Sequence, residues 1–357
     1  MPNNLFILDN LSGREKDSDI GREYASEIRK RLRALLLKGR IIVVSRDSNL
    51  DGLVAPALMM RIYGIGKKDV ILTQQAEYKE LERRLREMKP NGCSFVFSDL
   101  GVSSGDPEAV VRISRLLRSN GNNVIWLDHH PWDDIIINNI GRYTDYLVCG
   151  ESSMYCASEI THSLLCKKGK EEARLAALAH SADFPDAKSG KMNRLELLAR
   201  AITYTRTSKG RESGLLSIVE SLSRLEVEGK FITNAALMQK KVEERSTSVL
   251  LRNSHVVELK KARMGIGFSN GLNANYACAV LMKRLGCRIA IYIDTKTGKS
   301  GIRSARGIDS SAIARAMGGG GHPQASGFYV KPLSVSSKIG MKNAVKRIGS
   351  MAINSNI

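Results

Sequence analysis

Aspartate, asparagine and histidine residues gather directly after three short apolar runs of the sequence. The runs are IIVVS, SFVFS and VIWL, and the polar residues that follow them are Asp47, Asn49, Asp51, Asp99, Asp128, His129 and His130. If the runs are parallel strands, their carboxyl ends meet at the sheet edge where open α/β sheets bind ligands. Crowded carboxylates repel one another and lose hydration unless a cation lies among them. Oxygen ligands with a histidine suit Mn²⁺ or Mg²⁺, so the residues together predict a divalent-metal site.

Asp183 is a candidate for a further carboxylate ligand, because it ends the helix-like segment that finishes in HSAD. Taken singly, each aspartate is at least as well explained as a residue that caps a helix or forms a turn, because Asp commonly has these roles. Their recurrence after successive strands, next to a histidine pair, favours the metal site over that simpler interpretation.

A second constellation lies near the C-terminus, where four glycines follow a predicted helix at Ser310–Met317. Glycine lets backbone amides approach an anion without hindrance from a Cβ atom. Two arginines lie just upstream, and guanidinium groups clamp phosphate through paired N–H donors. The glycine run alone would suit a linker or a helix cap, but its neighbours favour a phosphate-binding loop. The residues that we expect to bind substrate are Arg303, Arg306, Gly319, Gly320, Gly321 and His322.

The elements that must position these residues alternate between strands and helices. Short apolar runs at Ile41–Val44, Val70–Leu72, Phe95–Phe97 and Val124–Leu127 are separated by helix-like stretches. This alternation predicts an α/β fold in which a parallel sheet is built from βαβ units. A smaller α/β domain is predicted further on, with a cleft between the two.

We expect the chain to divide into five parts, which the changes in pattern delimit. Residues 1–40 form an N-terminal helical segment with a helix at Arg22–Lys38, and residues 41–187 form the domain that carries the metal site. Residues 188–251 lack strand signals and form a helical connector. Residues 252–331 form the second α/β domain, and residues 332–357 form a basic tail.

Composition limits the classes of protein that this chain can represent. It has 357 residues and a net charge of +19, and the segment from Arg252 onward accounts for a net +14 of that charge. A skew of that kind favours a polyanionic partner bound partly by the C-terminal half. We find no apolar run that could span a membrane and no secretory signal. The six cysteines lack metal-type or paired spacing, which favours a reducing, cytoplasmic setting.

The chain resembles the DHH phosphoesterase superfamily, and within it the RecJ-like branch with its DHH-associated C-terminal domain. The matching residues are Asp128-His129-His130, Asp99 in FSDLG, Asp183 in HSAD, and GGGGHPQASG from Gly318 to Gly327. The resemblance covers about Ile41 to Lys331. It implies a phosphoesterase that depends on one or two Mn²⁺ or Mg²⁺ ions, with a cleft that accepts a single strand or a short oligonucleotide.

The resemblance also implies a role for each matched residue. Asp51, Asp99, His129 and Asp183 would hold one metal ion, while His130 would touch the scissile phosphate and Asp128 would hold His130 in place. The first motif departs from the family pattern His-x-Asp-x-Asp-Gly, because Asp47 stands for the histidine and Asn49 for the first aspartate. Asp47, Asn49 and a bridging Asp99 would form a second metal position, so that position is altered.

Three functions stay open at this point. The first is a metal-dependent exonuclease on single-stranded DNA or RNA, linked to replication or repair. The second is an inactive scaffold, because relatives of RecJ bind the GINS replication complex and some have lost metal ligands. The third is an oligoribonuclease or a phosphoesterase that acts on a nucleotide bisphosphate. The surviving ligands favour an active enzyme, and the altered first motif favours the scaffold.

Overall fold

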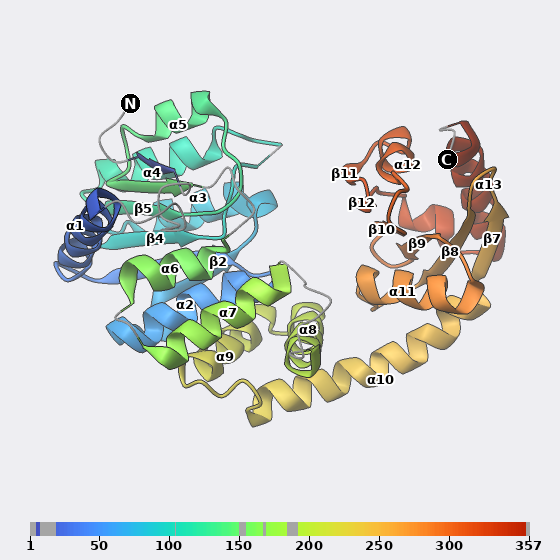
Figure 1. Ribbon diagram of the computed structural model, residues 1–357, viewed down its shortest axis with the longest axis horizontal. Coiled ribbons are helices and arrows are strands. Elements are labelled where there is room, and N and C mark those ends of the chain that lie inside the picture. The colour runs from blue at the N-terminus through green and yellow to red at the C-terminus, as the bar shows by residue number, and fades with distance from the viewer. Residues whose placement is uncertain are drawn as a thin grey trace. The chain divides into compact units, whose positions relative to one another are not determined.

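The computed structural model describes residues 5–7, 19–103, 105–149, 155–166, 169–183 and 192–354. The chain forms two compact units, Met1–Leu237 and Met238–Ile357, and the division falls within helix α10 (Lys230–Arg252). Each unit has its own sheet (Figure 1) and its own buried apolar clusters.

The sheet of the first unit contains six parallel strands in the order β1-β6-β5-β4-β2-β3. Their bounds are β1 (Leu5–Ile7), β2 (Ile41–Arg46), β3 (Val70–Thr73), β4 (Ser94–Ser98), β5 (Asn123–Leu127) and β6 (Tyr146–Cys149). The α/β fold with a parallel sheet is therefore confirmed, and all of the expected strands are present. From β2 the chain passes to β3 on one side and returns to β4 on the other. The carboxyl ends of β2 and β4 therefore flank a topological switch point, where such sheets bind ligands.

Helices cover both faces of this sheet, as parallel sheets require because their strands are apolar on both sides. Alternate residues of each strand face opposite sides, so Ile42 and Phe95 pack in one core while Val43 and Val96 pack in another. Figure 1 shows α3 (Tyr78–Met88), α4 (Ala109–Ser119) and α5 (Asp134–Ile140) over one face, and α2 (Leu50–Tyr63) and α6 (Ala157–Leu165) over the other. The remaining helices on this second face are α1 (Asp19–Leu36) and α7 (Lys170–Asp183).

The segment that we expected to be a connector is helical, but most of it packs into the first unit. Helices α8 (Met192–Thr207) and α9 (Arg211–Ser223) bury Leu198, Ile202 and Leu215 in one core with α2. Their apolar positions recur at helical spacing, and the sequence pattern does not show which surface they cover.

The second unit contains a mixed sheet in the order β11-β12-β10-β9-β8-β7. Only β8 and β9 pair in parallel, and the other pairs are antiparallel. The strands are β7 (Ser254–Glu258), β8 (Arg263–Ser269), β9 (Ile289–Asp294), β10 (Ser300–Ser304), β11 (Gly320–His322) and β12 (Ala325–Gly327). The second α/β domain that we expected is therefore present, with its own sheet.

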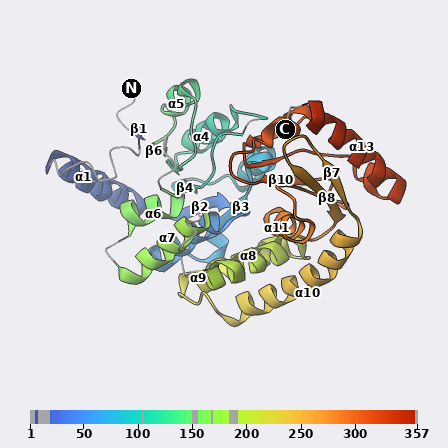
Figure 2. The same cartoon turned by 45° about the vertical axis from the view of Figure 1, so that its right-hand side comes forward.

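Helix α11 (Ala274–Leu285) covers one face of this sheet, and α12 (Ser311–Ala316) and α13 (Lys338–Asn354) cover the other (Figure 2). Where we expected a basic tail, α13 buries Ile348 and Ala352 against the sheet. Its lysines and arginines occupy its outer side, so a high charge does not prevent the helix from completing this core. Among helices in the described part of the chain, none combines the length and apolar character that crossing a bilayer requires.

Candidate metal centre

Four of the expected metal ligands meet at the carboxyl ends of β2, β4 and β5. The Nε2 atom of His129, which follows β5, lies 3.4 Å from Oδ1 of Asp99, which follows β4. The same nitrogen lies 3.9 Å from Oδ2 of Asp51 in the first turn of α2, and 3.7 Å from Oδ2 of Asp183 at the end of α7. Residues separated by up to 132 positions in sequence therefore form one cluster of three carboxylates and an imidazole.

The Asp51 carboxylate is held by the N-terminus of α6. Its two oxygens accept hydrogen bonds from the backbone amides of Ala157 at 2.8 Å and Ser158 at 2.7 Å. The Ser158 hydroxyl donates in turn to the Asp51 carbonyl at 2.9 Å. A helix N-terminus offers free N–H groups and a positive dipole end, so this contact both orients and stabilises the buried carboxylate.

Asp99 has the features of a residue that is shaped for a ligand. It is fully buried, and its backbone has a φ of 54°, a conformation that L-residues other than glycine rarely adopt. Among the described residues, neither of its carboxylate oxygens receives a hydrogen bond. A buried ionised carboxylate without such bonds is costly unless it is paired or binds a metal. Asp99 lies within ion-pair distance of His129 and Arg46, and its oxygens, which lack hydrogen bonds from the described residues, fit a divalent cation.

The electrostatics of the cluster agree with this interpretation. Burial, followed by the charges of Asp99 and Asp183, raises the pKa of Asp51 to about 7. Burial and the charge of Asp99 likewise raise the pKa of Asp183. Burial alone would lower the pKa of His129, but the surrounding carboxylates raise it to about 9. The carboxylates thus repel one another when they are all ionised, and a divalent cation would relieve this repulsion.

His130 and Asp128 form a contact beside the cluster and do not replace its ligands. The His130 Nδ1 atom lies 2.8 Å from Oδ1 of Asp128, and the Trp132 indole donates to Oδ2 at 2.8 Å. Burial would raise the pKa of Asp128, but the charge and hydrogen bond of His130 bring it below its ordinary value. Asp128 therefore holds the His130 ring in a defined orientation.

Gly101 contributes to this arrangement through the space that it leaves. A Cβ atom at this position would lie 2.9 Å from Cβ of His130, which is closer than two carbon atoms that are not bonded to each other normally approach. The glycine in FSDLG is thus required so that the His130 ring can pack against the loop after β4.

Two of the three residues expected to form a second metal position, Asp47 and Asn49, are engaged elsewhere. The buried carboxylate of Asp47 forms an ion pair with Arg211 of α9 and lies 3.8 Å from Nε of Arg206 of α8. Among the described residues, Asp47 belongs to no group of ligand atoms that lie within 4.8 Å of one another. Asn49 is the N-cap of α2, and its Oδ1 accepts a hydrogen bond from the Gly52 amide at 3.1 Å.

Sequence reasoning missed three arginines at this site. Arg46 ends β2, and its Nη1 lies 3.3 Å from Nε2 of His130 and 3.8 Å from Oδ1 of Asp99. Its place directly before the first motif was a signal that could have been used. Arg206 and Arg211 carried no local signal, because they lie more than 150 positions after Asp47 in helices of ordinary pattern.

The glycine-rich segment of the second unit forms a short hairpin and not an open loop. Gly320–His322 is β11, which pairs with β12, and a Cβ atom on Gly319 would lie 2.1 Å from the Gly327 carbonyl oxygen. The strand register aligns Arg303, Ala325 and His322 across three neighbouring strands. The side chain of His322 lies outside the described residues.

The two arginines expected to bind substrate differ in their surroundings. Arg303 donates to Oδ1 of Asn275 at 2.6 Å and to its neighbour's carbonyl, and Arg306 is exposed. Their role in binding phosphate stays a prediction.

A separate group of possible ligand atoms adjoins the site through α6. It consists of Cys156, Glu159 and His180. Glu159 accepts from the Cys156 backbone amide at 3.1 Å, and its Oε2 lies 2.7 Å from Nδ1 of His180. These contacts cap the helix whose first amides hold Asp51, and they give the three residues a structural role.

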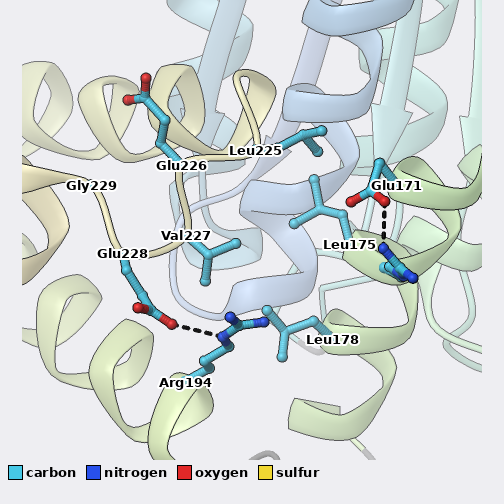
Figure 3. A pocket seen from close by; sticks show the side chains of 10 residues that line it. Glu171, Leu175, Leu178, Arg194, Leu225, Glu226, Val227, Glu228 and Gly229 are labelled. Atoms are coloured by element: carbon cyan, nitrogen blue, oxygen red, sulfur yellow. Dashed lines mark hydrogen bonds and ion pairs between the residues drawn. The ribbon is translucent and has the colours of Figure 1, made fainter.

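A cavity of about 810 Å³ in the first unit lies away from this chemistry. Its lining combines leucines with charged residues that already pair with each other, such as Arg194 with Glu228 at 2.7 Å (Figure 3). None of its lining residues belongs to the metal cluster, so we assign the site by its ligands and not by its volume.

Neither a protein-family model nor a curated protein matches this sequence. Solved structures with the same fold are found, however, at low sequence identity. RecJ from Thermus thermophilus in complex with Mn²⁺ has 18% identity and a TM-score of 0.56 over 91% of this chain and 54% of that one. The chain thus spans about half of that protein.

Two further structures match this chain over almost their whole lengths. The pGpG-specific phosphodiesterase PggH from Vibrio cholerae has 12% identity and a TM-score of 0.51, over 87% of this chain and 99% of that one. CDC45 from Entamoeba histolytica has 9% identity and a TM-score of 0.50, over 97% of this chain and 100% of that one. The chain therefore has the two-domain fold of RecJ-like DHH proteins, as the sequence resemblance predicted.

Proposed function

We propose that this protein is a divalent-metal-dependent phosphodiesterase, and that it acts as an exonuclease on single-stranded DNA or RNA. The observation that carries the proposal is the buried cluster of Asp51, Asp99, His129 and Asp183, with its orphaned Asp99 oxygens. Asp47 and Asn49, which the resemblance assigned to a second position, are not part of this ligand set.

A bound Mn²⁺ or Mg²⁺ ion would lower the pKa of a bound water and neutralise charge on the reacting phosphoryl group. The protein's own residues position the ligands and the groups that would contact the substrate. The α6 N-terminus holds Asp51 in place, and Asp128 orients His130. Arg46 presents guanidinium donors beside the cluster, where it would contact the scissile phosphate together with the His130 ring that it faces.

The charge of the second unit supports a polyanionic substrate. From Arg252 onward the chain has 17 Lys or Arg residues against 3 Asp or Glu residues. A dinucleotide offers few phosphates to such a surface, whereas a longer strand offers one per nucleotide. The fold of manganese-bound RecJ agrees with this substrate class, and we propose a role in DNA replication or repair on the same grounds.

The proposal is tested with end-labelled single strands of DNA and RNA in the presence of Mn²⁺. We expect mononucleotides to be released. We expect Asp99→Ala and His129→Ala each to lower the rate of cleavage by more than roughly 10–100-fold, which is the usual cost of removing a residue that only supports a metal ligand. Asp106→Ala is the matched control, because Asp106 follows the same strand but pairs with Arg112 at 2.7 Å. Absence of cleavage with any divalent ion would contradict the proposal.

A second candidate function is a non-catalytic scaffold that binds the GINS replication complex. It is favoured by the engagement of Asp47 and Asn49 in structural contacts, and by the likeness to the fold of CDC45. Purified chain that binds GINS but leaves every strand intact would favour this candidate over the nuclease.

A third candidate is a phosphoesterase for short oligonucleotides or nucleotide bisphosphates, in line with the fold of the pGpG-specific enzyme. The same assay separates it from the nuclease. Hydrolysis restricted to dinucleotides, with longer strands left whole, would favour it.

A further inference from the structure

We infer that this chain binds a single divalent ion and that arginine side chains occupy the positions that a second ion would need. The ion is held by Asp51, Asp99, His129 and Asp183, and this inference rests on the proposed metal-dependent function. Three observations on the described residues carry it.

The first observation concerns the other neighbours of Asp99. Asp99, His129 and His130 form a second group of ligand atoms within 4.8 Å of one another, so they are a candidate for another ion. Both ring nitrogens of His130 are already engaged, however. Nδ1 lies 2.8 Å from Asp128, and Nε2 lies 3.3 Å from Nη1 of Arg46.

The Arg46 guanidinium therefore lies where that ion would be. It is 3.8 Å from Oδ1 of Asp99, so it already provides a positive charge between the carboxylate and the imidazole. Arginine keeps its charge at every accessible pH, and like charges a few ångströms apart repel strongly in a partly buried site. A second cation at this position would have to displace the guanidinium.

The second observation concerns Asp47. Its side chain is 1% exposed, and each carboxylate oxygen faces a guanidinium group, Arg211 for Oδ2 and Arg206 for Oδ1. Arg211 is fixed in turn by Glu77, whose Oε1 lies 3.3 Å from it. Breaking a buried ion pair from one side leaves an uncompensated charge, so Asp47 is not available to a metal at low cost.

The third observation concerns Asn49, whose amide oxygen caps α2 through the Gly52 backbone. An amide has no net charge to offer a cation, and releasing it would also leave the Gly52 N–H without its acceptor. Neither residue of the altered first motif is therefore a ready metal ligand.

The arginines also supply what a second ion would contribute to the chemistry. Arg46 keeps 30% of its side chain exposed beside the cluster, so its guanidinium can donate hydrogen bonds to a substrate phosphate. Arg206 and Arg211 keep Asp47 neutralised, so that its charge does not oppose an anionic substrate. The site thus combines one metal ion with a fixed guanidinium for phosphate esters.

The experiment is a measurement of Mn²⁺ bound per chain, made on the full-length protein by equilibrium dialysis and metal analysis. Low-temperature electron paramagnetic resonance of the same samples distinguishes an isolated ion from a magnetically coupled pair. We expect one ion per chain with the spectrum of an isolated ion. Asp47→Asn should leave that number unchanged, and Asp51→Asn should remove the ion.

Removal of the arginines should open the second position. We expect Arg46→Met combined with Arg211→Ala to bind two ions per chain and to show the coupled spectrum. The matched control combines Arg40→Met, directly before β2, with Arg84→Ala, which breaks the exposed ion pair of α3 with Glu212 of α9. This control should keep one ion.

The outcomes separate the inference from the proposed function. Two ions in the wild type would overturn the inference and leave the metal-dependent function intact. No bound ion would overturn both. A folded double variant that still binds one ion would also overturn the inference, because the arginines would then not be what excludes the second ion.

Discussion

The Nδ1 atom of His130 lies 2.8 Å from Oδ1 of Asp128, and Nε2 of the same ring faces Arg46 at 3.3 Å. Because arginine can only donate, the geometry suits the tautomer in which Nδ1–H donates to Asp128 and Nε2 accepts. Asp128 therefore decides both where the ring lies and which nitrogen faces the site. Asp128 is a positioning residue for the proposed reaction.

Asp128→Asn should lower kcat about 10–100-fold, the usual effect of removing a partner of this kind. The amide can accept from one of the two donors, His130 or Trp132, but its NH₂ group opposes the other. The KM and the affinity for Mn²⁺ should stay unchanged, because Asp128 is not in the ligand cluster. Steady-state kinetics and Mn²⁺ titration measure these quantities.

Asp133→Asn is the control for this change, because Asn caps a helix as well as Asp does and Asp133 only caps α5. An Asp128→Asn variant with weaker Mn²⁺ binding and an unchanged kcat would show that the residue acts on the metal and not through His130.

Gly101→Ala should displace His130 and lower activity, since the added Cβ atom would lie 2.9 Å from Cβ of His130 and 3.2 Å from Oδ2 of Asp128. Overpacking of this kind typically costs about 1–3 kcal/mol of folding free energy. Gly105→Ala, a few residues further on, meets no atom within 4 Å and should change neither activity nor stability. Equal behaviour of the two variants in activity and thermal unfolding would contradict the proposed role of Gly101.

Ile348→Ala should destabilise the second unit by about 2–5 kcal/mol, because its side chain is fully buried under the mixed sheet. Ile339→Ala on the same helix should stay within about 0.5 kcal/mol, because Ile339 is 74% exposed. Both tryptophans, Trp126 and Trp132, lie in the first unit. The urea unfolding transition measured by circular dichroism should thus move to lower urea concentration for Ile348→Ala. The transition measured by tryptophan fluorescence should not move. A shift in fluorescence alone would contradict the placement of α13.

The buried cysteines should resist alkylation in the native protein. Cys93, Cys156, Cys166, Cys278 and Cys287 are buried free thiols, and burial raises the pKa of Cys166 and of Cys278 to about 12. The reactive thiolate is therefore scarce at pH 8. Mass spectrometry after iodoacetamide treatment should show these cysteines unmodified until denaturant is added. Rapid modification of Cys278 in the native protein would contradict this, because it would show that α11 separates readily from the sheet.

The sequence predicted that most of these side chains would lie together because its signals are local. Each ligand follows an apolar run or ends a helix, and parallel strands must bring their carboxyl ends to one edge. Asp51, Asp99 and His129 could be placed together from that rule alone. Asp183 follows a helix and not a strand, so its place among them came from the resemblance and from the structure.

The sequence did not show how polar residues of the first motif are used. Asp47 and Asn49 have oxygen atoms that could bind a metal, and nothing near them in sequence indicates another partner. The ion pair of Asp47 with Arg211 spans 164 positions, and it exists because α8 and α9 pack on α2 through apolar residues. A helix pattern predicts an apolar face but not the surface that it covers.

By itself, the sequence determined the α/β class, the parallel strands and the convergence of Asp51, Asp99 and His129 at one sheet edge. These follow from side-chain period and from short-range order along the chain, which the sequence displays directly. Only the tertiary structure decided that Arg46, Arg206 and Arg211 surround the altered motif, and that residues expected to be a connector and a tail complete two cores. Those relationships depend on which distant surfaces pack together, because charge pairs form only after apolar packing has brought their helices into contact.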